Sequence, residues 1–151
     1  MPTPTDGTEA PDFELPDQHG NPVRLSHYRD KSPVVIYFYP KDDTTGCTIE
    51  ACQFRDDFSR FQITGAEIFG ISDDSVESHE RFAGKYNLPF TLLSDKGGRV
   101  RKLYGVKKTF GVIPGRVTFV IDRKGIVRHV LSSQSSPARH VEEALVALAL
   151  P

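Results

Sequence analysis

Apolar residues in the middle of the chain form short, uninterrupted runs of strand length. The clearest runs are VVIYFY at 34–39, EIFGIS at 67–72 and VTFVI at 117–121. Such runs are typical of strands buried on both faces, as in a sheet that helices cover. The segment GIVRHVL at 125–131 follows the third run after a short turn, which predicts that these last two strands pair antiparallel.

Between these runs, apolar residues recur at intervals of three and four, which is the spacing of one face of an α-helix. Such stripes occupy residues 47–61, 76–86 and 141–148. Ser136 and Pro137 are residue types that favour the N-cap and the first position of the last helix. Strands that alternate with helices predict an α/β fold with a central mixed β-sheet flanked by helices.

The N-terminal part has a different pattern. Residues 1–11 form a loose lead-in, after which Phe13 and Leu15 alternate with polar residues. Val23 and Leu25 do the same beyond the turn-forming sequence DQHGNP, so we expect an N-terminal β-hairpin. The length suits one domain, so we expect residues 1–151 to form a single unit.

Composition and charge are those of an ordinary globular protein. Nineteen basic and 20 acidic residues give a net charge of −1, which provides no general attraction to nucleic acid or to an anionic membrane. No apolar run approaches the roughly 20 residues that span a bilayer, and the N-terminus lacks the pattern of a secretory signal. We expect a cytoplasmic protein, or an organellar one if a targeting segment has been removed, where disulfides are transient.

The basic segment 96–108 contains six cations and no acid. We interpret it as a solvated surface, and a docking surface for an acidic partner is the alternative. Among the other polar and aromatic residues, His79 lies on the apolar stripe of its helix. We expect it to pack at the edge of the core, with a role as ligand or base as the alternative. For Phe38, Tyr39 and Phe110 we expect core packing, and lining of the pocket is the alternative.

Both cysteines of the chain, Cys47 and Cys52, lie within TGCTIEACQFRD. They could simply be small buried hydrophobic residues. A zinc site is a weak alternative, because it needs four ligands and the five histidines are scattered. A permanent disulfide would close too short a loop to stabilise the fold much. The spacing alone leaves a redox pair and a buried structural pair equally open.

The position of Cys47 favours the redox pair. It follows a strand, Pro40 and a loop, so it falls in the first turn of a helix, where free N–H groups and the helix dipole favour a thiolate. Gly46 allows the backbone to come close to whatever the sulfur attacks. On a regular helix, the Cα atoms of Cys47 and Cys52 would be separated by at least about 7.5 Å of axial rise. A disulfide needs Cα atoms within about 6.8 Å, so either this segment is never oxidised to a disulfide or oxidation unwinds the helix.

Pro40, Thr44 and Cys47 form the pattern P-x3-T-x2-C, which resembles the active-site signature of the peroxiredoxins. With Cys52 five residues later, the chain resembles the subgroup called bacterioferritin comigratory protein or peroxiredoxin Q. The resemblance covers nearly the whole chain, from APDFELPDQHGNPVRLS to GRVTFVID. It implies a thioredoxin-like fold and thiol-dependent reduction of hydrogen peroxide and alkyl hydroperoxides, without a metal or a bound cofactor.

The resemblance also implies roles for individual residues. Cys47 corresponds to the peroxidatic cysteine and Cys52 to the resolving one, which would form an intramolecular Cys47–Cys52 disulfide. Thr44 is expected to hydrogen-bond the peroxide, Pro40 to shield the sulfur and Arg116 to lie beside the thiolate. The roles of Glu50 and Arg55 stay open. The expected peroxide-binding residues are Thr44, Gly46, Cys47 and Arg116.

The resemblance implies a monomer that a thioredoxin-like reductant recycles. A disulfide oxidoreductase is a weaker alternative, because the spacing is C-x4-C rather than C-x2-C. The absence of tryptophan disfavours a site like that of the glutathione peroxidases. The alternative from another class is a peroxide-sensing relay protein that passes its oxidation to a partner and stops near one equivalent of peroxide.

Overall fold

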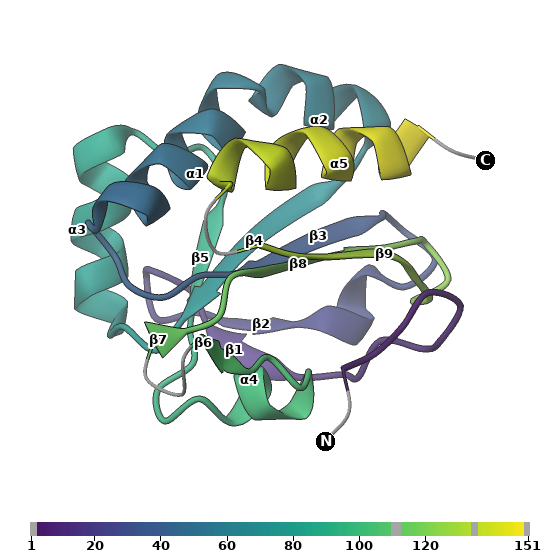
Figure 1. Ribbon diagram of the computed structural model, residues 1–151, viewed down its shortest axis with the longest axis horizontal. Coiled ribbons are helices and arrows are strands. Elements are labelled where there is room, and N and C mark those ends of the chain that lie inside the picture. Colours follow the sequence, from purple (N-terminus) through teal and green to yellow (C-terminus); the bar gives the residue numbers. More distant parts are fainter. Residues whose placement is uncertain (1–2, 110–112, 134–135, 150–151) are drawn as a thin grey trace.

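The computed structural model describes residues 3–109, 113–133 and 136–149. At its centre lies a five-stranded mixed sheet in the order β5–β4–β3–β8–β9 (Figure 1). Strands β3, β4 and β5 are parallel to one another, whereas β8 runs antiparallel to β3 and β9 antiparallel to β8. The bounds are β3 (Val34–Phe38), β4 (Glu67–Ser72), β5 (Thr91–Ser94), β8 (Val117–Ile121) and β9 (Val127–Ser132).

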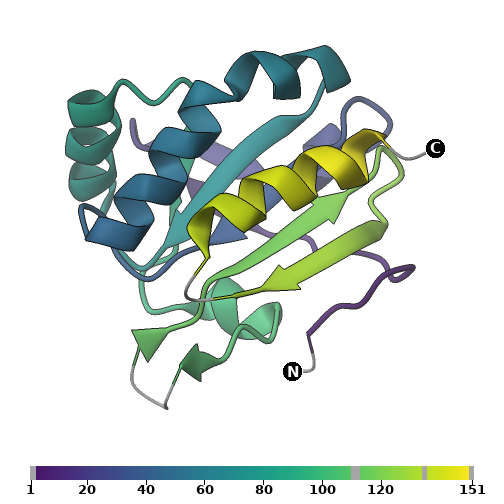
Figure 2. The same cartoon turned by 45° about the horizontal axis from the view of Figure 1, so that its top comes forward.

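Helices cover one face of this sheet (Figures 1 and 2). There, α5 contacts both α1 and α2, and α3 packs against β5. The opposite face carries the hairpin of β1 and β2, with the short helix α4. The bounds are α1 (Thr45–Asp56), α2 (Phe58–Thr64), α3 (Val76–Tyr86), α4 (Arg99–Leu103), α5 (Pro137–Ala149), the 3₁₀-helix η1 (Leu25–Tyr28), β1 (Glu14–Pro16), β2 (Pro22–Arg24), β6 (Lys108–Thr109) and β7 (Ile113–Pro114).

Alternation along β3 divides the core into two layers, because successive side chains of a strand point to opposite faces. Ile36 and Phe38 pack with Phe13 and Leu15 of the N-terminal region. Tyr37, by contrast, packs with residues of α1 and α5 in the second cluster. Every residue of β3 is buried, as the apolar run predicts.

The predicted strands and helices are confirmed, but one predicted helix is divided, and the structure adds β6, β7 and η1 as well as β5 and α4. The stripe 47–61 forms two helices, because α1 ends before Asp57 and α2 begins after it. The strand β5 and the helix α4 were not predicted. The start of α4 depends on Asp95, whose carboxylate accepts hydrogen bonds from the backbone N–H groups of Val100 and Arg101 at 3.0 and 2.9 Å.

The solvated surface predicted for residues 96–108 is wrong for Arg101, which is buried. Its guanidinium donates to the carbonyl oxygens of Tyr39 at 2.8 Å and Gly115 at 2.9 Å, and lies 5.7 Å from the ring centre of Phe38. Arg101 thus satisfies two buried backbone acceptors that lie just outside the strands β3 and β8.

The packing predicted for Phe38, Tyr39 and His79 is confirmed, since all three side chains are buried. Phe110 lies outside the described residues. No described helix combines the length and the apolar character that crossing a bilayer requires.

Candidate active site

Cys47 lies in the first turn of α1, just beyond the end of β3. Thr44 is the N-cap residue of this helix and has an extended backbone, so the chain turns into the helix at that point. The Cys47 side chain is 1% exposed and packs with Tyr37 and Ala51. Cys52 is half-buried further along the same helix, and both thiols are free. The two cysteines therefore share one continuous helix in this structure.

Arg116, immediately before β8, lies against Cys47. Its Nη2 is 3.4 Å from Cys47 Sγ, and its Nη1 donates to Glu50 Oε1 at 2.5 Å. Burial works against charge on this guanidinium, but the adjacent Glu50 and Cys47 outweigh it and raise the pKa of Arg116. One fixed cation therefore faces the sulfur and a carboxyl group together.

Gly46 makes this approach possible. A Cβ atom at this position would lie 3.0 Å from Nη2 of Arg116, tighter than ordinary van der Waals contact. The sequence suggested that Gly46 leaves room for the molecule that the sulfur attacks. In the structure, the guanidinium of Arg116 occupies the space beside Gly46.

Glu50 is fully buried beside Arg116. Burial raises the pKa of Glu50 to about 8, although the Arg116 cation opposes this shift. Its Oε1 accepts from Arg116, while Oε2 has no hydrogen-bond partner among the described residues. The group facing Oε2 is His140, whose Nδ1 lies 3.7 Å away.

His140, on α5, is held by two further contacts. Its Nε2 lies 2.7 Å from the carbonyl oxygen of Ser133, and its Nδ1 lies 2.6 Å from the hydroxyl oxygen of Thr118. Because a carbonyl only accepts, Nε2 carries the proton and Nδ1 accepts from Thr118. Burial lowers the pKa of His140 to about 4, so the ring is neutral at pH 7.

Sequence reasoning left the role of Glu50 open and did not single out Thr118 or His140. Two signals were available. Thr118 is the one polar residue in the run VTFVI, and His140 lies beside Val141 at the start of the last apolar stripe. A polar side chain in a buried strand or on a buried helix face needs a partner.

Thr44 and Pro40 border the first turn of α1. Thr44 is exposed, and its hydroxyl donates to the Lys41 carbonyl at 2.9 Å. Pro40 is half-buried just after β3. Among the described contacts, the Thr44 hydroxyl thus bonds the loop backbone rather than the sulfur of Cys47.

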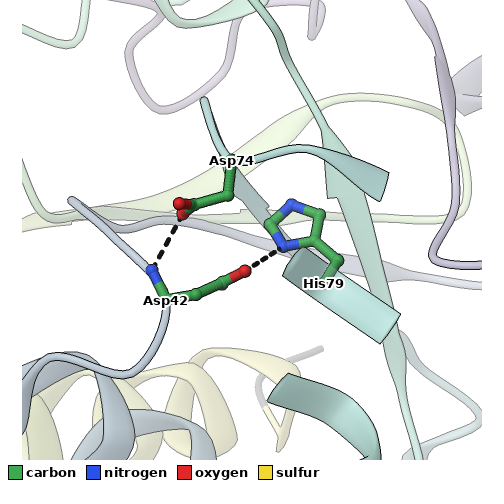
Figure 3. Close-up of side chains that lie close together, drawn as sticks. All are labelled: Asp42, Asp74 and His79. Carbon is green, nitrogen blue, oxygen red and sulfur yellow. Dashed lines mark hydrogen bonds and ion pairs between the residues drawn. The ribbon is translucent and has the colours of Figure 1, made fainter. Parts of the chain in front are cut away.

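The loop before α1 is anchored by a polar cluster (Figure 3). Asp42 lies 2.7 Å from His79 Nδ1 and accepts from the hydroxyls of Tyr39 and Ser78 at 2.5 and 2.8 Å. Its backbone N–H donates to Asp74 at 2.8 Å. Asp42, Asp74 and His79 are residue types that bind metals, and their ligand atoms lie within 4.8 Å of one another. Each is already engaged by protein groups, so the cluster fits a fixed support for the loop better than a metal site.

Arg55, whose role was open, also holds α1 in place. It donates to the backbone oxygen of Tyr86 on α3 at 2.8 Å and to Asp56 at 3.0 Å. The contact with α3 joins the helix that carries both cysteines to its neighbour.

A family model described as the AhpC/TSA family matches residues 7–130. The chain belongs to this family. Within it, the chain is a peroxiredoxin of the peroxiredoxin Q group, at 54% identity over 142 residues to "Peroxiredoxin Q, chloroplastic" of Sedum lineare. The same protein of Triticum aestivum is 51% identical over 140 residues.

Solved structures of peroxiredoxins agree with this fold. Peroxidoxin BcpB from Mycobacterium tuberculosis has a TM-score of 0.89 at 42% identity over 96% of both chains. The bacterioferritin comigratory protein of Xanthomonas campestris has a TM-score of 0.81 at 33% identity, with 91% of this chain and 92% of that one covered. The α/β, thioredoxin-like fold of the sequence analysis is therefore confirmed.

The chain spans only part of the length of the plant relatives that it matches. The match covers 93% of this chain and 76% of the Sedum protein, but 92% of this chain and only 64% of the Triticum protein. Both plant proteins are named as chloroplastic.

Proposed function

We propose that this peroxiredoxin is a thiol peroxidase that reduces hydrogen peroxide and alkyl hydroperoxides, with Cys47 as the attacking group. The observation that carries this proposal is the contact between Arg116 and the Cys47 sulfur at the start of α1. A buried cysteine without such a role would be packed among apolar groups rather than against a guanidinium.

In the first step, the Cys47 thiolate attacks one peroxide oxygen. A sulfur–oxygen bond forms, the oxygen–oxygen bond breaks, and the leaving oxygen takes up a proton to become water or an alcohol. A change of about 30-fold in the population of a reacting form corresponds to only about 2 kcal/mol of activation free energy. The larger contribution must come from groups that stabilise charge on both oxygens, for which Arg116, Thr44 and the N–H groups near Cys47 are suited.

In the second step, the Cys52 thiol condenses with the sulfenic acid on Cys47, which releases water and forms a disulfide. The two residues are five positions apart on the regular helix α1, so their Cα atoms lie too far apart for this bond. The first turns of α1 must unwind, which also carries Glu50 away from Arg116.

We assign the further properties on the same grounds. The disulfide between Cys47 and Cys52 would be exposed by unwinding, and a thioredoxin-like reductant would cleave it. The bacterioferritin comigratory protein of Xanthomonas campestris is described as having alkyl peroxide reduction activity. We place the chain in a reducing compartment, the cytoplasm or an organelle, as a monomeric single domain over residues 1–151 that needs no cofactor and binds neither membrane nor nucleic acid.

Turnover tests the proposed function against the peroxide-sensing alternative. With a thioredoxin system present, the unaltered protein should consume many equivalents of peroxide, and Cys47→Ser should consume none. Cys52→Ser should react once and then stop. Consumption that ends near one equivalent in the unaltered protein would indicate a sensor, and an active Cys47→Ser would reverse the assignment of the two cysteines.

A further inference from the structure

Two buried acidic groups share one guanidinium at the start of α1. Cys47 is 1% exposed and Glu50 is 0% exposed, and Arg116 contacts both of them. Among the described residues, Arg116 is the cation that touches both groups. With the thiol and the carboxyl both ionised, this buried site would hold two negative charges against one positive charge.

His140 does not supply the missing positive charge. Its ring faces Oε2 of Glu50 at 3.7 Å, but Nε2 is bound to a carbonyl and Nδ1 to the Thr118 hydroxyl. The ring is neutral at pH 7 in this buried place. The ring therefore restricts the position of the Glu50 carboxyl group but adds no positive charge to the site.

The other titratable groups around the site do not supply this positive charge. Arg101 is bound to two backbone carbonyls, and Asp42 contacts His79. Burial, followed by the nearby Glu50 and Cys47, raises the pKa of Tyr37 on β3, so its hydroxyl stays neutral. On the outer side of α5, Glu143 contacts Arg139 and His129 of β9 at 2.8 and 2.7 Å.

An uncompensated charge buried in this way is expensive, so one of the two acids should keep a proton. The contacts indicate which oxygen of Glu50 would carry it. Oε1 accepts from Arg116, whereas Oε2 has no hydrogen-bond partner among the described residues. With Oε2 protonated, the sulfur is the one anionic group that Arg116 contacts in this described pair.

We propose that Glu50 is the charge-compensating partner of Cys47, which is protonated while Cys47 is a thiolate and ionised once peroxide has oxidised the sulfur. This inference rests on the proposed function. The step balances: the thiolate, the peroxide and the protonated Glu50 give the sulfenic acid, one water or alcohol, and the Glu50 carboxylate. Arg116 remains paired with one negative charge before and after the step, so the site stays neutral throughout. Glu50 acts through Arg116 and touches no reacting atom.

Proton uptake during the first step tests this inference. The reaction is stopped at the sulfenic acid with Cys52→Ser and followed in weak buffer at pH 7 with a pH indicator. The Cys52→Ser protein should take up no net proton, since the one that the leaving oxygen needs is balanced by the one from Glu50. Adding Glu50→Gln should raise the uptake to about one proton per oxidised Cys47, because the neutral amide has none to give. Equal uptake in the two proteins would overturn the inference.

The matched control is Glu142→Gln, which removes an exposed carboxyl group from α5. In the Cys52→Ser background it should leave the uptake at zero. Mass spectrometry of the same samples shows whether Cys47 has gained one oxygen. If Cys47 has gained no oxygen, the proposed function fails. If Cys47 has gained one oxygen and proton uptake is the same with and without Glu50→Gln, only the role of Glu50 fails.

A second measurement needs no change at Glu50, in case Glu50→Gln does not fold. Infrared difference spectra of Cys52→Ser, before and after one equivalent of peroxide, should lose the carbonyl band of a protonated carboxylic acid and gain a carboxylate band. An unchanged protonated-acid band in fully oxidised protein would refute the inference.

Discussion

The guanidinium of Arg116 lies 3.4 Å from the sulfur of Cys47, although 69 residues separate them in the chain. The contact exists because β8, which follows Arg116 directly, runs beside β3, which precedes the loop to Cys47. The same guanidinium holds Glu50. Any change that moves Arg116 therefore affects both acidic groups.

Gly46→Ala should slow the peroxide step without weakening the fold. The new methyl group would lie 3.0 Å from Nη2 of Arg116, so the guanidinium must shift by a few tenths of an ångström. We expect a loss of about tenfold in the rate of the first step, because displacements of this kind disturb an aligned site. Stopped-flow oxidation of Cys47 measures it.

Gly84→Ala is the matched control for this change. Gly84 lies in α3, and a Cβ atom there would meet nothing within 4 Å. Alanine should stabilise either helix by about 0.5–1 kcal/mol where it fits. We expect Gly84→Ala to show that gain with an unchanged rate. A Gly46→Ala protein as fast as the unaltered one would refute the steric argument.

Arg116→Ala should reduce the rate of the first step by about 10²–10³-fold, the loss typical when a charge-stabilising donor is removed. Stopped-flow oxidation, with a melting curve to confirm folding, checks this. Arg128→Ala serves as the control, since Arg128 pairs with Asp122 at 2.7 Å on the surface and should leave the rate unchanged. A near-normal rate in folded Arg116→Ala would remove Arg116 from the mechanism.

Disulfide formation should lower the helix content by about one to two turns, because the bond cannot form on regular α1. Far-UV circular dichroism before and after oxidation measures the change. The Cys52→Ser protein, oxidised to the sulfenic acid, should keep its spectrum. Full disulfide formation with unchanged helix content would contradict the unwinding argument.

The stability of the reduced protein, measured relative to Glu50→Gln, should fall as pH rises from about 6.5 to about 8. Burial raises the pKa of Glu50 from 4.5 to about 8, so in this window the folded state keeps a proton that the unfolded state has already lost. Burial lowers the pKa of His140 from 6.5 to about 4, which makes stability rise with pH between those values and offsets the Glu50 effect there.

Urea unfolding at several pH values checks this. The difference in the free energy of unfolding between the unaltered protein and Glu50→Gln should drop by up to about 1.4 kcal/mol per pH unit between pH 6.5 and 8. This comparison isolates Glu50, because glutamine does not titrate and the other titratable groups are common to both proteins. Parallel pH profiles for the two proteins would show that Glu50 does not hold the proton.

Sequence pattern alone determined the strands β3, β4, β8 and β9, the hairpin and most of the helices. Each of these elements consists of consecutive residues. Burial of one or both of its faces therefore gives a short-range pattern of apolar residues that can be recognised in the sequence. The position of Cys47 in the first turn of α1 could also be predicted locally, because the helix begins after a strand and a loop that the sequence shows. The break at Asp57 did not follow, since the apolar spacing continues across it.

Only the tertiary structure decided which residues surround the sulfur. The resemblance placed Arg116 beside Cys47, but the burial of Glu50 and the approach of His140 depend on how α5 packs against α1 and β8. Arg101 likewise looks like a surface cation in sequence, yet its guanidinium is buried and donates to two backbone carbonyls from other parts of the chain. Contacts between residues distant in the chain depend on the order of the strands in the sheet and on helix packing. Short-range patterns of apolar residues determine neither of these.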